Sequence, residues 1–135
     1  MDFKELIDTW GRIWEAYLSL WQGYWPIMIV AHLYILLQAT WVHYLAVMNL
    51  SRNRNKLTPF ARFWAYSVLA VGYPLDMLFN LIFGTIFFVE PPKELLFTGR
   101  CSRLIDEDDG WRRDLAKWFC RNMLDPFDPK GIHCR

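Results

Sequence analysis

The sequence predicts an all-α membrane protein: a two-span transmembrane helical hairpin, preceded by an N-terminal amphipathic interfacial helix and followed by a short C-terminal helical tail. Two observations lead to this prediction. Gly23–Leu50 and Phe63–Val89 are almost free of charge, whereas the rest of the 135-residue chain is rich in it. Aromatic residues make up 18% of the chain and include eight Trp, and such side chains suit the boundary between membrane and water.

The first span is expected over 23–50 and the second over 63–90. No Asp, Glu, Lys or Arg interrupts the first span, and the second contains one such residue within its apolar stretch, Asp76. Each exceeds the roughly 20 apolar residues that a helix needs to cross the hydrocarbon core. A buried helical pair in a soluble protein is the alternative, but too little polar chain remains to cover two such helices.

A basic loop, 51–62, is expected to join the spans. Its basic residues are Arg52, Arg54, Lys56 and Arg62, and it has no acidic residue. Short loops rich in Lys and Arg stay in the cytoplasm. We therefore expect this loop in the cytoplasm and both termini on the opposite side, although basic residues near the other ends of the spans oppose this orientation.

Residues 1–22 are expected to form the amphipathic helix. Apolar side chains recur on one face at helical spacing: Phe3, Leu6, Ile7, Trp10, Trp14, Tyr17, Leu18 and Trp21. Charged residues occupy the opposite face, as in a helix that is half covered by an apolar surface. Such a helix beside a span lies in the plane of the interface. Packing on a partner or on the tail is the alternative.

The tail, 91–135, is expected to be soluble or to lie on the membrane surface, with a short helix near 110–124. Its 45 residues are expected to offer too small a hydrophobic core to fold on their own. An aromatic face is expected on the short helix, where Trp111, Leu115, Trp118 and Phe119 recur at helical spacing. The membrane surface or the N-terminal helix is expected to cover it.

Four side chains of the tail have metal-binding or redox chemistry: Cys101, Cys120, His133 and Cys134. Three thiolates and an imidazole could hold zinc in a tetrahedral set, although no C-x-x-C pair is present. A disulfide between two of the cysteines is favoured if the tail lies outside the cytoplasm. Free thiols are the third alternative, and no cofactor is otherwise expected.

Gly72, Asp76, Asn80 and Gly84 recur every four residues along the second span. They predict a single packing ridge, because small residues let another helix approach closely and polar ones can bond across the contact. Asp76 is expected to face protein or water, since a charged carboxylate in hydrocarbon costs roughly 2.5–3.5 kcal/mol. We expect a neutral, hydrogen-bonded Asp76 in a helix contact, with a proton or ion pathway as the alternative.

The first span carries three polar residues of its own, His32, Gln38 and His43. The histidines are eleven residues apart and return to nearly the same face, whereas Gln38 points away from both. One neighbouring ridge cannot meet all three. Different faces are therefore expected to meet different partners, in a homo-oligomer or with another membrane protein.

No catalytic signature is found. Gly99 has no glycine-rich partner that would form a phosphate loop. Cys101 and His133 lack an orienting third group for nucleophilic catalysis. The formal net charge of +1 gives no electrostatic footprint for nucleic acid. The start of the chain does not have the pattern of a secretory signal peptide.

Three blocks of the C-terminal half resemble small uncharacterised membrane proteins encoded in tailed-phage genomes. The blocks are YPLDMLFN (Tyr73–Asn80), EPPKELLFTGRCSR (Glu90–Arg103) and LDPFDPKGIHC (Leu124–Cys134). The resemblance implies a bacterial inner membrane and a part in phage infection there, such as lysis or exclusion of rival phage. It assigns no functional residue.

The expected function is non-enzymatic association with the bilayer and, within it, with a second copy or another membrane protein. The ridge and the aromatic faces of the flanking helices would supply the contacts. A holin-like pore-former is one alternative, because holins are small membrane proteins with one to three spans. A proton- or ion-coupled membrane subunit that uses Asp76 is the other.

Overall fold

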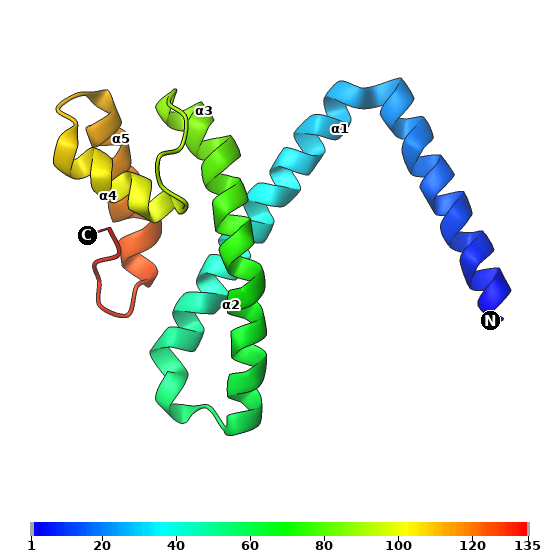
Figure 1. The fold of residues 1–135 in the computed structure, drawn as a ribbon, viewed down its shortest axis with the longest axis horizontal. Coiled ribbons are helices and arrows are strands. Elements are labelled where there is room, and N and C mark those ends of the chain that lie inside the picture. The colour runs from blue at the N-terminus through cyan, green and yellow to red at the C-terminus, as the bar shows by residue number, and fades with distance from the viewer. Residues whose placement is uncertain (1, 135) are drawn as a thin grey trace. The chain divides into compact units, whose positions relative to one another are not determined.

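The computed structural model describes residues 2–134, and their regular structure is entirely helical (Figure 1). The elements are α1 (Phe3–Asn53), η1 (Arg54–Lys56), α2 (Pro59–Phe79), η2 (Asn80–Gly84), α3 (Thr85–Phe88), α4 (Phe97–Glu107), α5 (Trp111–Phe119), η3 (Cys120–Leu124) and η4 (Asp125–Phe127). Two stretches, Phe3–Lys56 and Pro59–Phe88, are long and apolar enough to cross a membrane. The prediction of an all-helical chain with two long apolar helices is confirmed.

The chain divides into two compact units, one ending at Ile35 and the other beginning at Leu36. In the first unit, α1 is interrupted only at Tyr24, which has non-helical backbone angles (φ −132°, ψ 32°). Pro26 explains the interruption, because a proline inside a helix removes a hydrogen bond and its ring clashes with the carbonyl four residues earlier. The boundary expected between the interfacial helix (1–22) and the first span (23–50) lies beside this bend.

The connector is shorter than the expected loop 51–62. α1 continues to Asn53, and α2 begins at Pro59. The Thr58 hydroxyl accepts a hydrogen bond from the backbone N–H of Ala61 at 3.3 Å, and Pro59 fills the first helical turn, where its missing N–H costs little. The predicted end of the loop at Arg62 is wrong, because the helix start signal at Thr58 and Pro59 precedes Arg62 and brings it into α2.

α2, η2 and α3 follow one another without a break and are called the rod below. The second element, η2, is a π-helical turn, which is wider than an α-helical turn. α3 ends at Phe88, since Val89 adopts the left-handed conformation (φ 50°) and two prolines follow at Pro91 and Pro92.

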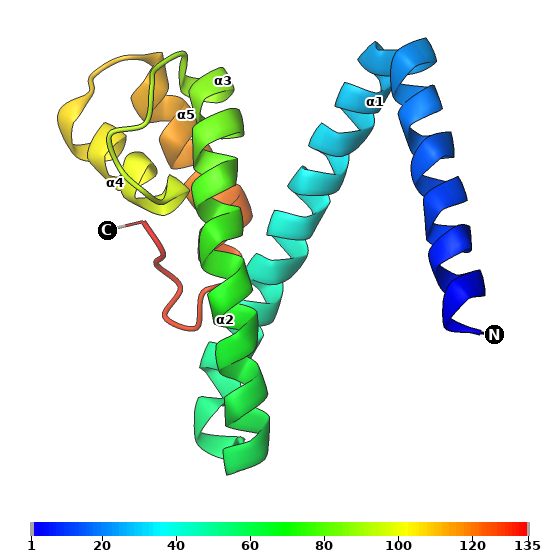
Figure 2. The ribbon, with the colours of Figure 1, turned by 45° about the vertical axis from the view of Figure 1, so that its right-hand side comes forward.

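The tail folds back beside the α3 end of the rod (Figure 2). Its core joins both parts: Phe88, Phe97, Cys101, Leu104, Ala116, Cys120 and Leu124. The expectation of a single short helix near 110–124 is incomplete, because α4 precedes α5. Phe97, Cys101 and Leu104 lie on one face of α4. Their helical spacing is hard to recognise in the sequence, because most residues between them are polar.

Candidate functional site

The predicted ridge lies inside the second unit, where the chain's own helices cover it. A Cβ atom on Gly72 would lie 3.7 Å from a Val47 methyl group and 4.0 Å from the His43 Cβ, both on α1. Asn80 is buried, and its Nδ2 donates a hydrogen bond to the Glu94 carbonyl at 2.7 Å. The hypothesis that the ridge receives a separate protein is therefore corrected: it packs against α1 and the tail.

Gly84 makes room for Arg100, which reaches the rod from α4. The Arg100 side chain is 0% exposed, and a Cβ atom on Gly84 would lie 2.7 Å from its Nη1. Within residues 2–134, none of its three guanidinium nitrogens has a hydrogen-bond partner. Burial lowers the pKa of Arg100, against the opposing effect of Glu94 and Glu90. A side chain at position 84 would therefore displace the Arg100 guanidinium.

A helix-end contact also holds the tail to the rod, and ion pairs hold α4 to the segment that joins it to the rod. Arg103 pairs with Glu90 at 2.7 Å and also with Glu94. Arg112 donates a hydrogen bond through Nε to the last carbonyl of α3 at 2.8 Å, one of the acceptors that a helix end leaves free. Burial alone would raise the pKa of Glu90, but Arg103 and Lys93 hold it below its ordinary value. The tail is thus a docked unit.

Asp76 also faces the tail. Its carboxylate lies beside the backbone N–H of Phe97, the first residue of α4. α4 has no hydrogen bond from a side-chain cap of its own. The first N–H groups of a helix need acceptors, and the helix dipole favours negative charge at that end. This placement favours a packing role for Asp76 over the alternative of a proton pathway.

We expect Asp76→Asn to leave tail docking almost unchanged, because the amide oxygen can still lie beside the backbone N–H of Phe97. Asp76→Ala removes the acceptor and should cost about 1 kcal/mol, as for a lost helix cap. The measurement is the rate at which N-ethylmaleimide modifies the buried Cys101 in detergent, with a rise of roughly fivefold expected for the alanine variant. An asparagine variant as reactive as the alanine variant would contradict the capping role.

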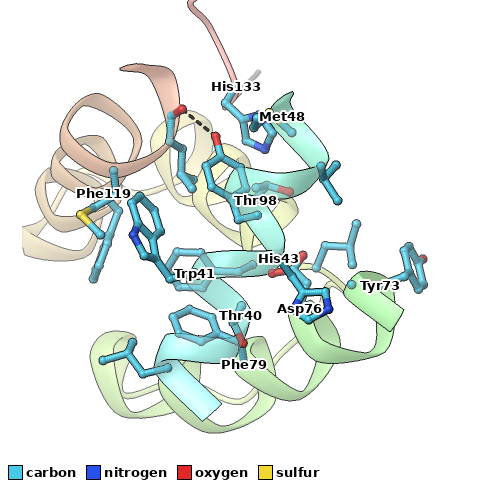
Figure 3. Close-up of a pocket in the computed structure, with 18 of the residues that line it drawn as sticks. Thr40, Trp41, His43, Met48, Tyr73, Asp76, Phe79, Thr98, Phe119 and His133 are labelled. Atoms are coloured by element: carbon cyan, nitrogen blue, oxygen red, sulfur yellow. Dashed lines mark hydrogen bonds between the residues drawn. The ribbon is translucent and has the colours of Figure 1, made fainter. Parts of the chain in front are cut away.

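A cavity of about 710 Å³ lies between the second half of α1, the rod and the tail (Figure 3). Its walls are mainly apolar, and Gln38, His43 and Asp76 are among its polar residues. The His43 Nδ1 donates to the Ala39 carbonyl at 2.9 Å, which leaves Nε2 free to accept a hydrogen bond. Gln38 and His43 both line this cavity, and the expectation that different faces of the first span meet different partners stays a prediction.

A disulfide joins Cys120 to Cys134. Cys101 remains a buried free thiol, and burial raises its pKa to about 12. Since two of the four candidate ligands are bonded to each other, the zinc set that also includes His133 is not formed in this structure. No cluster of three or more His, Cys, Asp or Glu side chains that could hold a metal occurs in the described part of the chain.

The C-terminal segment that follows α5 contacts α1. The Tyr44 hydroxyl donates a hydrogen bond to the Leu124 carbonyl at 2.6 Å, and its ring lies 5.3 Å from the imidazole of His133. Nearer the connector, Arg52 donates to the Phe127 carbonyl at 3.4 Å. The tail therefore extends along α1 and forms one wall of the cavity.

His32 lies in the first unit, where it links the two sides of the bend at Tyr24. Its Nδ1 donates to the Met28 carbonyl at 2.6 Å, so that Nε2 accepts from the Tyr17 hydroxyl at 2.9 Å. The Trp21 ring lies 5.3 Å from the imidazole. Both ring nitrogens are used in these contacts, which favours a structural role for His32.

These features define the class of the protein: an all-helical chain with two helices that could cross a membrane and a tail docked on the second. No protein-family model, curated protein or solved structure matches the chain. The tail contacts at Arg100, Asp76 and Tyr44 have no simple sequence pattern.

Proposed function

We propose that the chain is a non-enzymatic, multi-pass membrane protein that acts by lateral association with itself or with another membrane protein. In this proposal α1 and the rod form a transmembrane hairpin, and the helix before the bend lies at the interface. The bilayer is a bacterial inner membrane and the protein is phage-encoded, as the resemblance of its C-terminal half implies. No cofactor, nucleic acid or catalytic step is part of the proposal.

The exposed apolar side chains of the long helices support the membrane placement. On α1, Val30 and Ile35 are 66% and 61% exposed, and on the rod Leu81 and Ile86 are 54% and 59% exposed. Keeping such surface in water costs about 25 cal/mol for each Å². Lipid tails would cover these side chains at no such cost.

The position of the tail along the rod is the observation that favours association. The rod, Pro59–Phe88, has 30 residues and is about 45 Å long, which matches a bilayer with its headgroup layers. The tail packs beside it from Asp76 to Phe88, which is about 20 Å of its length. In a hairpin that spans the bilayer, the tail would therefore extend below the headgroup layer.

The outer side of the tail is poorly suited to hydrocarbon. Asp114 and Arg121 are exposed there, and charged side chains at bilayer depth are costly unless protein or water covers them. The exposed Trp118 stands between them in the sequence. A second copy or a partner protein is the cover that we propose for this surface.

The disulfide and the basic connector favour one orientation independently. Disulfides such as Cys120–Cys134 persist outside the cytoplasm. Connector residues such as Arg54 and Lys56 favour the cytoplasmic side. The proposed orientation therefore has the connector in the cytoplasm and the α3 end of the rod, where the tail begins, on the opposite side.

Trp118→Ser should weaken association at least tenfold, because large aromatic side chains contribute most of the binding energy at protein interfaces. The measurement is the number of copies in each bilayer disc, determined by native mass spectrometry as the ratio of protein to disc is raised, together with crosslinking from the tail in cells. Trp64→Ser is the matched control: Trp64 is 56% exposed, against 52% for Trp118, and lies near the connector.

A single copy in every disc, together with no crosslink from the tail to any protein, would rule out the proposed association. If Trp64→Ser weakened association as much as Trp118→Ser does, the tail would not be the association surface. Abrupt collapse of the membrane potential on expression in growing bacteria would favour the holin-like alternative instead.

A further inference from the structure

Two cavities of the second unit adjoin each other along α1 and α2. The larger, of about 710 Å³, includes Asp76, and the smaller, of about 500 Å³, lies at the connector end and includes Arg62. Val47, Met48 and Leu69 line both cavities. The distance from Asp76 to Arg62 along the helix is about 21 Å. The two adjoining cavities, called the groove below, together extend over a length comparable to that of an acyl chain.

The connector end of this groove is basic. Arg54 and Arg62 line the smaller cavity together with Ser51 and Asn55, and no acidic residue is among its lining residues. Neither arginine belongs to an ion pair within residues 2–134. Two guanidinium groups beside a hydroxyl and an amide offer the donors that a phosphate group needs.

The other end of the groove is largely apolar. Its volume lies within the range of about 300–1,000 Å³ that is usual for ligand cavities. Phe79, Phe87 and Phe119 are among the side chains that line it. The side chains around an empty apolar cavity lose dispersion contacts, and a water molecule inside it finds few hydrogen-bond partners. This end is therefore suited to a hydrocarbon chain.

We propose that the groove binds one anionic phospholipid, with its phosphate at Arg54 and Arg62 and one acyl chain passing Leu69 into the larger cavity. This inference rests on the membrane placement proposed above, in which the connector faces the cytoplasm. Anionic lipids are concentrated in the cytoplasmic leaflet, and basic pockets between transmembrane helices bind their headgroups. A free phosphate would use the arginines but leave the apolar end unfilled.

The headgroup is tested with the Arg54→Gln/Arg62→Gln double variant. Protein recovered from the membrane fraction is titrated in micelles with phosphatidylglycerol and with phosphatidylcholine of identical acyl chains, and bound lipid is counted by native mass spectrometry. The wild-type protein should prefer phosphatidylglycerol at least tenfold, and the double variant should bind it roughly 30-fold more weakly. Lys56→Gln, a connector residue outside the cavity lining, is the control and should bind as the wild type does.

The chain site is tested with Leu69→Trp, which fills the wall shared by the two cavities. Leu78→Trp is the control, since both leucines are on α2 and are 43% exposed but only Leu69 lines the groove. Leu69→Trp should weaken binding of long-chain phosphatidylglycerol about tenfold and leave a six-carbon-chain analogue unaffected, as expected for a cavity that a larger side chain fills. Glycerol 3-phosphate at the lipid concentration should not displace the lipid.

Equal binding of the two lipids, or an equal loss of lipid binding with Lys56→Gln, would show that lipid is attracted by diffuse charge and not by a specific site. Displacement by glycerol 3-phosphate would identify a free phosphate as the ligand, and normal lipid binding by Leu69→Trp would exclude the chain site. Because the protein is taken from the membrane fraction, failure of these measurements would leave the proposed membrane crossing intact. The association experiment at Trp118 is independent of both.

Discussion

Replacing Gly84 with leucine is expected to detach the tail from the rod. Even the Cβ atom would lie 2.7 Å from the Arg100 Nη1, and the Arg100 side chain is fully buried. Overpacking a close contact costs typically 1–3 kcal/mol, and we expect about 3 kcal/mol here. Since modification of a transiently opened state follows its population, Cys101 should react roughly 100-fold faster with N-ethylmaleimide.

Two other glycines provide matched controls for this measurement. A Cβ atom on Gly72 would make an ordinary contact with Val47 at 3.7 Å, and one on Gly23 would meet nothing within 4 Å. Gly72→Ala and Gly23→Ala should therefore leave Cys101 protected, whereas Gly84→Ala should expose it in part. Full protection of Cys101 in Gly84→Leu would show that Arg100 does not need the space at position 84.

Reduction of the Cys120–Cys134 disulfide is expected to release the C-terminal segment from α1. The two cysteines are 14 residues apart in sequence, and closing a loop of this size stabilises the folded state by about 3 kcal/mol. With the constraint gone, the contact of His133 with Tyr44 would be lost and the adjoining wall of the cavity would open. The tail core around Cys101 should remain packed, because α4 is held by separate contacts.

The measurement is labelling of intact cells with a membrane-impermeant maleimide, before and after treatment with an impermeant phosphine. We expect no label before reduction and one label after it, at Cys134, because Cys120 is buried in the tail core that stays packed. Cys101 should stay unlabelled, since it is buried and burial raises its pKa to about 12. Cys120→Ser is the control and should take one label, at Cys134, without reduction.

Labelling that requires an opened membrane would place the tail in the cytoplasm and overturn the proposed orientation. A label at Cys134 of the wild-type protein without reductant would show that the disulfide is absent in cells. Either result would also bring back the zinc alternative for the tail, because a reducing compartment leaves all four candidate ligands available.

The ridge shows what a local sequence pattern can predict and what it cannot. Spacing alone places Gly72, Asp76, Asn80 and Gly84 along one side of a helix, because side-chain direction follows helical periodicity. Spacing does not identify the neighbour that fills the ridge. Arg100 lies 16 positions beyond Gly84 in sequence, and only the fold of the tail brings it there. The same is true of Gln38 and His43, which line one cavity although they point in different directions from α1.

The sequence by itself determined the helical class, the presence of two long apolar helices and the basic character of the connector. These properties depend on composition and periodicity within short windows, which each segment carries alone. Only the tertiary structure decided that α4 docks on Gly84, that Asp76 faces the start of α4 and that the tail closes the cavity. Those contacts join residues distant in sequence, and their strength depends on burial and shape, for which no local pattern exists.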